Sequence, residues 1–178
     1  MNISPYKSSD KEEIKHLFTR VFSDSENTSE GKLIVNLAFD LLNNTDPQDL
    51  FAFTACENEK IMGCIIFSKL MFDTPINAFI LSPVAIDTEH QGRGIGQALI
   101  NYGINQLKQA DIELVFTYGD LNFYSKVGFE QITQEVAQAP FHLSQPEGWL
   151  CQSLIGNKIP HLKGTSRCVQ ALNHVELW

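Results

Sequence analysis

The feature that most constrains this sequence is a strand, a glycine-rich turn and a helix in direct succession over residues 79–107. An apolar stretch runs to Asp87, and Gln91-Gly92-Arg93-Gly94-Ile95-Gly96 follows it. Apolar side chains then recur at helical spacing as far as Leu107, which predicts an amphipathic helix packed on a sheet. Such a turn leaves several backbone N–H groups unpaired at the positive end of the helix, so its natural occupant is a phosphate group.

The spacing of the glycines distinguishes three phosphate-binding motifs. A P-loop places Lys and then Ser or Thr after its last glycine, but Gln97 and Ala98 follow Gly96, which excludes an ordinary nucleoside triphosphatase. A dinucleotide-binding turn that starts at Gly92 needs glycine at position 97, although acidic residues do occur about 20 residues downstream. Dinucleotide binding therefore stays as a weaker alternative, and Gln-x-x-Gly-x-Gly is the motif that remains.

This motif, after the strand Leu81 to Asp87, resembles the coenzyme A pyrophosphate loop of the GNAT superfamily, the acyl-CoA-dependent N-acyltransferases. The stretch from Asp120 to Phe129, with Tyr124 inside it, resembles a later helix of the same family. The chain looks most like the small single-domain predicted N-acetyltransferases of bacteria, and the resemblance is clearest over residues 79–130.

Fold class follows from the resemblance and from the order of the predicted elements. The resemblance implies a mixed α/β (α+β) domain over residues 1–178, with a central, mostly antiparallel sheet of six or seven strands flanked by about four helices. Periodicity and turn residues predict a helix capped by Ser9, a polar break at 23–31 and a second helix that ends at Asn43-Asn44. Strands are predicted at 2–6, 50–56, 61–72, 76–87, 112–117, 129–135 and 150–155, and residues 156–178 have no clear assignment.

The resemblance also implies acetyl-CoA as the cosubstrate. Its pyrophosphate would be held by backbone N–H groups of Gln91, Gly92, Arg93, Gly94, Ile95, Gly96 and Gln97. Val84, Ala85 and Ile86 would offer backbone groups to the pantetheine arm and to the thioester oxygen. Tyr124 is the candidate acid for the departing thiolate, whereas Asp120 is expected to be a helix cap rather than a catalyst.

The predicted activity is transfer of an acetyl group from acetyl-CoA to a primary amine, on a small molecule or a peptide, by direct attack. The alternative is a non-catalytic CoA-binding sensor or regulatory module. The general base stays open among Asp73, Glu57, Asp87, Glu89, Glu113 and His90, and the acceptor pocket among Phe72, Phe141, His142 and Trp149.

Charge and composition exclude several other classes. The net charge is -8 and no basic run occurs, which argues against a nucleic-acid surface. No stretch approaches the roughly 20 apolar residues of a membrane span, and the amino terminus lacks the apolar core of a secretory signal, so we expect a cytoplasmic protein. The four cysteines form no CxxC pair and the five histidines are scattered, which predicts reduced thiols and no metal site. A homodimer is the default expectation.

Overall fold

The structure is a computed structural model, and it describes residues 1–23 and 28–178. The chain forms two compact units. The first contains Met1–Phe67 and Pro83–Gly103, and the second contains Ser68–Ser82 and Ile104–Trp178. Three elements begin in one unit and end in the other: β3 (Lys60–Met71), β4 (Ala78–Ile86) and α3 (Ile95–Gln109).

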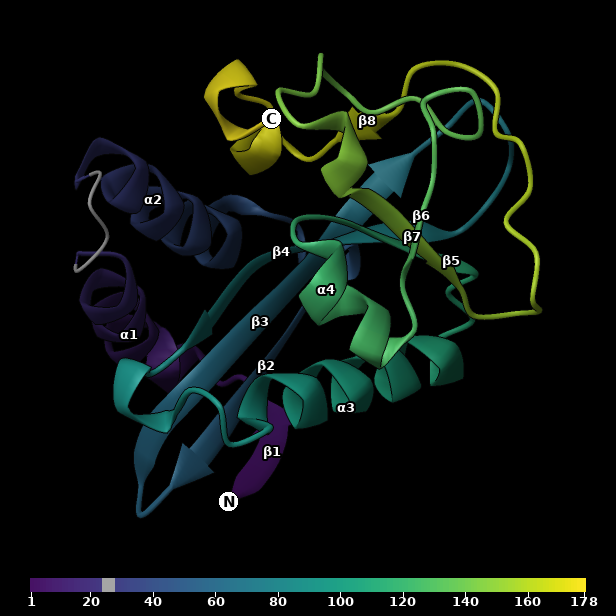
Figure 1. Cartoon of the computed structure of the whole chain (residues 1–178). Helices are drawn as coiled ribbons and strands as arrows, with labels where there is room; N and C mark the ends of the chain where they lie inside the picture. The colour runs from purple at the N-terminus through teal and green to yellow at the C-terminus, as the bar shows by residue number, and fades with distance from the viewer. Residues whose placement is uncertain (24–27) are drawn as a thin grey trace. The chain divides into compact units, whose positions relative to one another are not determined.

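In the first unit, two amphipathic helices, α1 (Lys11–Ser23) and α2 (Thr28–Asn44), lie side by side (Figure 1). The side chains that α1 buries are Ile14, Leu17 and Phe18, which share one face of the helix. Both helices are confirmed, and α2 ends at Asn44 as predicted. The predicted Ser9 cap is wrong, because Ser9 lies in a 3-10 turn, Ser8–Asp10, and its hydroxyl donates to the Asp10 carboxylate at 3.2 Å. Part of the predicted polar break, residues 24–27, lies outside the described residues.

The strands of the first unit begin with β1 (Asn2–Pro5), which pairs antiparallel with β2 (Leu50–Glu57). A two-residue turn then leads into β3 (Lys60–Met71). Its residues Asn58 and Glu59 have φ angles of 50° and 63°, which matches the turn type whose twist suits a tight hairpin.

The predicted strand, turn and helix are present as β4 (Ala78–Ile86), a short 3-10 turn at Thr88–His90 and α3 (Ile95–Gln109). Within the second unit, the first residues of β4 pair in parallel with β5 (Leu114–Tyr118), in a register that ends at Leu81 and Thr117. The Thr117 hydroxyl donates to the Leu81 carbonyl at 2.9 Å. This register ends two residues before Pro83, which lacks the N–H that a ladder requires.

The other strands of the second unit continue from β5. It pairs antiparallel with β7 (Trp149–Ser153), and β7 pairs antiparallel with β6 (Glu130–Gln131). A longer strand, 129–135, was predicted in place of β6. The chain turns away instead, because the Val136 N–H donates to the Thr133 carbonyl at 3.1 Å.

The carboxyl-terminal residues contribute to the core of the second unit. β8 (Arg167–Cys168) pairs antiparallel with β3, and two single 3-10 turns follow at Gln170–Leu172 and Val175–Leu177. Trp178 stacks on Tyr118 and meets Trp149 edge to face, with ring centroids 6.2 and 6.1 Å apart.

The strand order is β1-β2-β3-β4-β5-β7-β6, with β8 on β3, which makes an eight-stranded sheet. In the described part of the chain this sheet is accompanied by four α-helices, of which α4 (Leu121–Tyr124) is a single turn. The mixed α/β, mostly antiparallel architecture is therefore confirmed. The sheet has one strand more than the upper predicted number of seven, because β8 has only two residues and carries no periodic signal.

Gly103 provides a test of how α3 packs within the first unit. A Cβ at this position would lie 2.7 Å from the ring of Phe67 and 3.0 Å from Ile65. Overpacking costs about 1–3 kcal/mol and the better helix propensity of alanine returns at most about 1. We therefore expect Gly103→Ala to lower the melting temperature by a few degrees in calorimetry. The control Gly156→Ala, whose Cβ meets nothing within 4 Å, should leave it unchanged.

Candidate functional site

The turn between β4 and α3, residues 91–97, has the backbone geometry of a phosphate cradle. Gly92 and Gly94 have φ angles of 76° and 77°, a region that residues with a Cβ rarely adopt. A Cβ built at either glycine meets nothing within 4 Å, so space is open on that side of the turn. The first N–H to bond back along the helix is that of Ala98, which donates to the Gly94 carbonyl at 3.0 Å. The N–H groups at the start of α3 therefore remain available to an anion.

Side chains tie this turn to the end of β4. The Gln91 amide donates to the Ile86 carbonyl at 3.1 Å, and the Asp87 N–H donates to the Met62 carbonyl at 2.8 Å. Arg93 is exposed beside the two glycines, where its guanidinium can add a charge-assisted contact to an anion. Val84 and Ile86 are half-buried and Ala85 is buried, and they belong to the same unit as the turn.

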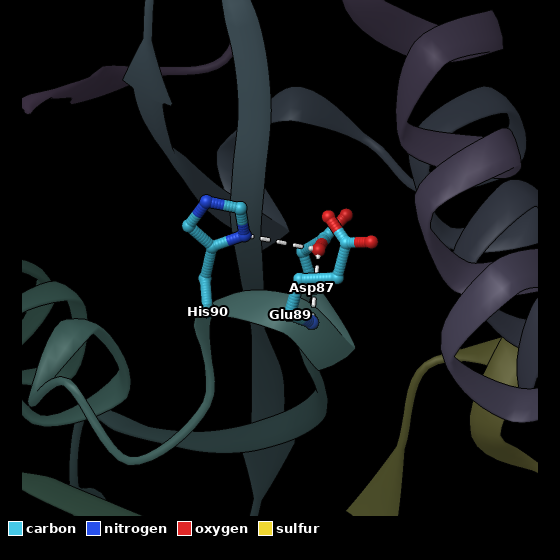
Figure 2. A group of neighbouring side chains, drawn as sticks. All are labelled: Asp87, Glu89 and His90. Carbon is cyan, nitrogen blue, oxygen red and sulfur yellow. Dashed lines mark hydrogen bonds and ion pairs between the residues drawn. The ribbon is translucent and has the colours of Figure 1, made fainter.

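Asp87 is the most connected side chain near the turn. It is 5% exposed, and its Oδ1 lies 3.1 Å from His90 Nδ1 and accepts the Glu89 N–H at 3.2 Å. Figure 2 shows the His90 ring turned toward this carboxylate. The other oxygen, Oδ2, lies 3.2 Å from the Arg20 guanidinium and 3.8 Å from the Lys60 ammonium. One carboxylate thereby joins α1, the start of β3 and the residue that precedes the glycine turn.

These contacts also decide the charge of Asp87. Burial by itself raises the pKa of this carboxyl group. The hydrogen bonds from His90, Arg20 and the Glu89 N–H, together with the Lys60 charge, outweigh burial and hold the pKa below its ordinary value. Asp87 is therefore an anion at neutral pH.

Asp87, Glu89 and His90 have ligand atoms that lie within 4.8 Å of one another (Figure 2). The scattered histidines predicted no metal site, so this proximity is a finding of the structure. Two cations already contact Asp87 Oδ2, and a metal ion would have to displace or tolerate both of them. The cluster is better explained as an ion-paired anchor for the strand end.

Tyr124 lies on α4 in the second unit, and the glycine turn lies in the first. Asp120 caps α4 by accepting the Asn122 N–H at 2.9 Å, so its predicted role as a cap is confirmed. The Tyr124 ring packs edge to face against Phe123 and Phe129. Gly119 leaves room for it, because a Cβ there would come within 2.7 Å of the ring.

The phenol of Tyr124 is suited to staying protonated. Burial raises the pKa of this group, and a hydrogen bond with the Thr117 side chain only partly opposes that effect. A general acid must carry its proton before the reaction, which a raised pKa guarantees at neutral pH.

The candidate general bases are mostly engaged in structural contacts. Glu113 accepts the Asn77 N–H at 2.8 Å, Asp73 pairs with Arg167 at 3.1 Å, and Glu57 lies 3.8 Å from the amino terminus. Asp87 and His90 are bound to each other. The structure therefore singles out no side chain as the base.

Of the aromatic residues considered for the acceptor pocket, two belong to the core. Trp149 is fully buried and donates its Nε1 proton to the Ala137 carbonyl at 2.8 Å, and Phe72 packs on Phe116. Phe141 is half-buried beside a cavity, and His142 is exposed.

All four cysteines are free thiols, as expected. Burial raises the pKa of Cys64 and Cys151 far above the ordinary value, and raises the pKa of Cys168 to about 11. These three groups are therefore protonated at neutral pH and are poor nucleophiles. Across the described residues, no helix combines the length and apolar character needed to cross a bilayer.

Comparison with known proteins agrees with this geometry. The model of the acetyltransferase (GNAT) family matches residues 11–129. The uncharacterised N-acetyltransferase YjhQ of Escherichia coli is 30% identical over 167 residues, which cover 90% of this chain and 87% of that protein.

Solved structures share the fold. The Escherichia coli GNAT family N-acetyltransferase YhbS, in complex with CoA, superimposes with a TM-score of 0.78 at 21% identity, covering 97% of this chain and 92% of that one. A GNAT family acetyltransferase from Brucella melitensis, in complex with acetyl-CoA, gives a TM-score of 0.70 at 23% identity, covering 96% and 97%. The family model and the 30% identity with YjhQ show that the chain belongs to the GNAT family of acetyltransferases.

Proposed function

We propose that this chain acts as one domain that transfers the acetyl group of acetyl-CoA to a primary amine by direct attack. The observation that carries the proposal is the turn at residues 91–97, with two glycines at positive φ and open space beside them. Backbone N–H groups from Gln91 to Gln97 would hold the pyrophosphate, with the dipole of α3 behind them. The solved YhbS and Brucella melitensis structures, which contain CoA and acetyl-CoA, support this choice of ligand.

The reaction requires two proton transfers and no covalent enzyme intermediate. The amine nitrogen attacks the acetyl carbon, a C–N bond forms and the C–S bond breaks. Backbone groups of Val84, Ala85 and Ile86 would align the pantetheine arm and stabilise the thioester oxygen as it gains charge. Tyr124 would give its proton to the departing thiolate, and the attacking amine would lose its own to water or to a side chain. Protonated thiols at Cys64, Cys151 and Cys168 favour direct attack over a cysteine-linked intermediate.

Gly94 tests the pyrophosphate cradle. A Cβ here has room in the protein but strains a backbone with φ of 77° and projects from the turn that would face the ligand. We expect Gly94→Ala to raise the dissociation constant of CoA at least about tenfold in isothermal titration calorimetry, about 1.4 kcal/mol. Gly156→Ala, which adds the same methyl group to open space, should bind CoA normally. Equal affinity in both variants would contradict the cradle.

Tyr124→Phe tests the acid. The variant removes the phenol oxygen alone, so kcat should fall about 10²–10⁴-fold while CoA affinity stays within a factor of about two. The measurement is thiol release in the presence of an accepted amine. Tyr118→Phe is the matched control, since the Tyr118 hydroxyl bonds to Ser144 and to the Gln145 N–H. A non-catalytic CoA-binding module, the alternative function, would bind CoA and show no turnover in any variant.

Asp87→Asn tests the anchor of the turn. The amide keeps the shape of the side chain but leaves Arg20 and Lys60 without an anion. Because both cations are about half exposed, we expect the free energy of unfolding to fall by an amount at the lower end of about 1–3 kcal/mol. The pKa of Asp87 is lower in the folded chain than in the unfolded chain. The ionised carboxylate therefore stabilises the fold fully at pH values above the pKa that this group has in the unfolded chain. That contribution is lost as the pH falls through the folded pKa.

Denaturant unfolding should therefore show a gap in stability between wild type and Asp87→Asn that is full at pH 7 and shrinks below about pH 4. CoA affinity should weaken roughly tenfold, because His90 and the turn lose their anchor. Asp46→Asn is the control, since Asp46 caps another 3-10 turn through the Gln48 N–H at 2.9 Å. A gap that is independent of pH would show that the charge of Asp87 is unimportant.

A further inference from the structure

The second unit contains a cavity of about 740 Å³ beside β8 and the end of β3, a size that fits a small-molecule site. β8 is the yellow strand near the carboxyl terminus in Figure 1. The walls of the cavity include Met71 from β3, Arg167 from β8 and Phe141 from the segment between β6 and β7. The cavity lies within the second unit, whereas the glycine turn belongs to the first.

The anionic group of the cavity is Asp73, whose backbone is hydrogen-bonded to the loop before β8. Its N–H donates to the Lys163 carbonyl at 3.1 Å, and the Lys163 N–H donates to the neighbouring Thr74 hydroxyl at 2.8 Å. Gly164 has a φ of 79°, and a Cβ on it would overlap the Asp73 carboxylate. The glycine therefore allows this carboxylate to lie directly against the backbone.

The cationic group, Arg167, lies beside it. Arg167 is opposite Met71 in the register of β8 with β3, and its Nη1 donates to Asp73 Oδ1 at 3.1 Å. The two side chains are 56% and 60% exposed, so their ion pair contributes only about 0–1 kcal/mol and opens at little cost. A guanidinium carries five donors, so this contact leaves others able to take a carboxylate.

The rest of the wall combines apolar surface with polar groups. Met71 is 39% exposed, which is high for a methionine in a strand, and Phe141 is half-buried. Ser166 is 2% exposed, and its hydroxyl has no hydrogen-bond partner among the described residues. This oxygen is itself buried, and the charged groups that line the cavity are those of Asp73 and Arg167.

We propose that this cavity binds an α-amino acid with an apolar side chain. The ammonium and carboxylate of an α-amino acid are attached to one carbon, which matches an anion and a cation in direct contact on the protein. Asp73 binds the ammonium, Arg167 binds the carboxylate, and the side chain packs against Met71 and Phe141. The site goes beyond the proposed acetyl transfer, and its occupation requires no CoA.

Titration calorimetry of the full chain without CoA tests the assignment, with L-phenylalanine as the probe. We expect saturable binding that weakens at least about tenfold for N-acetyl-L-phenylalanine, which lacks the ammonium, and for L-phenylalaninamide, which lacks the carboxylate. Glycine, which lacks an apolar side chain, should also bind more weakly.

Asp73→Asn and Arg167→Gln should each weaken binding of L-phenylalanine at least about tenfold. Both side chains are exposed, so circular dichroism should show folded variants. Glu147→Gln and Lys158→Gln, which remove the same charges from exposed positions of the same unit, should bind as the wild type does. The assignment is overturned if the wild-type chain shows no binding at millimolar concentrations, or if Asp73→Asn and Arg167→Gln bind as tightly as their controls.

Discussion

One buried carboxylate fixes the place where β4 ends and the glycine turn begins. An unpaired charge at the position of Asp87 would cost several kcal/mol, so the fold depends on the groups that surround it. Arg20 comes from α1, Lys60 from the start of β3, and His90 from the turn itself. The carboxylate at the strand end is therefore also in contact with the first helix.

The glycine turn uses that anchor in a simple way. A phosphate cradle made of backbone N–H groups is useful only if the turn keeps one conformation, and glycines are the most flexible residues in an unfolded chain. The Asp87 contact with His90 and the Gln91 contact with Ile86 restrain the turn from the side that precedes Gly92. The start of α3 restrains it from the other side. The glycines allow the positive φ angles of the turn, and the contacts of neighbouring residues restrict the turn to one conformation.

A feature of this structure could be predicted from the sequence only where the residues that encode it lie close together along the chain. The strand, turn and helix from Ala78 to Gln109 were predictable because apolar periodicity and glycine spacing are local. The partners of Asp87 were not, since Arg20 lies 67 residues away and nothing local marks it. β8 has two residues and no pattern, so the extra strand was missed. Trp149 was considered for the acceptor pocket, but it belongs to the core. The sequence does not distinguish an aromatic side chain in a core from one that lines a pocket.

The family resemblance is strong where the backbone has the proposed functional role and weak where side chains have it. Main-chain groups that would hold the pyrophosphate of CoA require only glycines and a helix start, which a short stretch of sequence can encode. An acceptor amine has to be recognised by side chains, whose identity differs from one enzyme to another. The family model ends at residue 129, and the chain beyond it also supplies Phe141, Ser166 and Arg167 to the cavity, whose proposed ligand is separate from the acetyl transfer. What is particular to this protein is therefore expected in its last third, where local patterns are weakest and long-range pairing through β8 decides the structure.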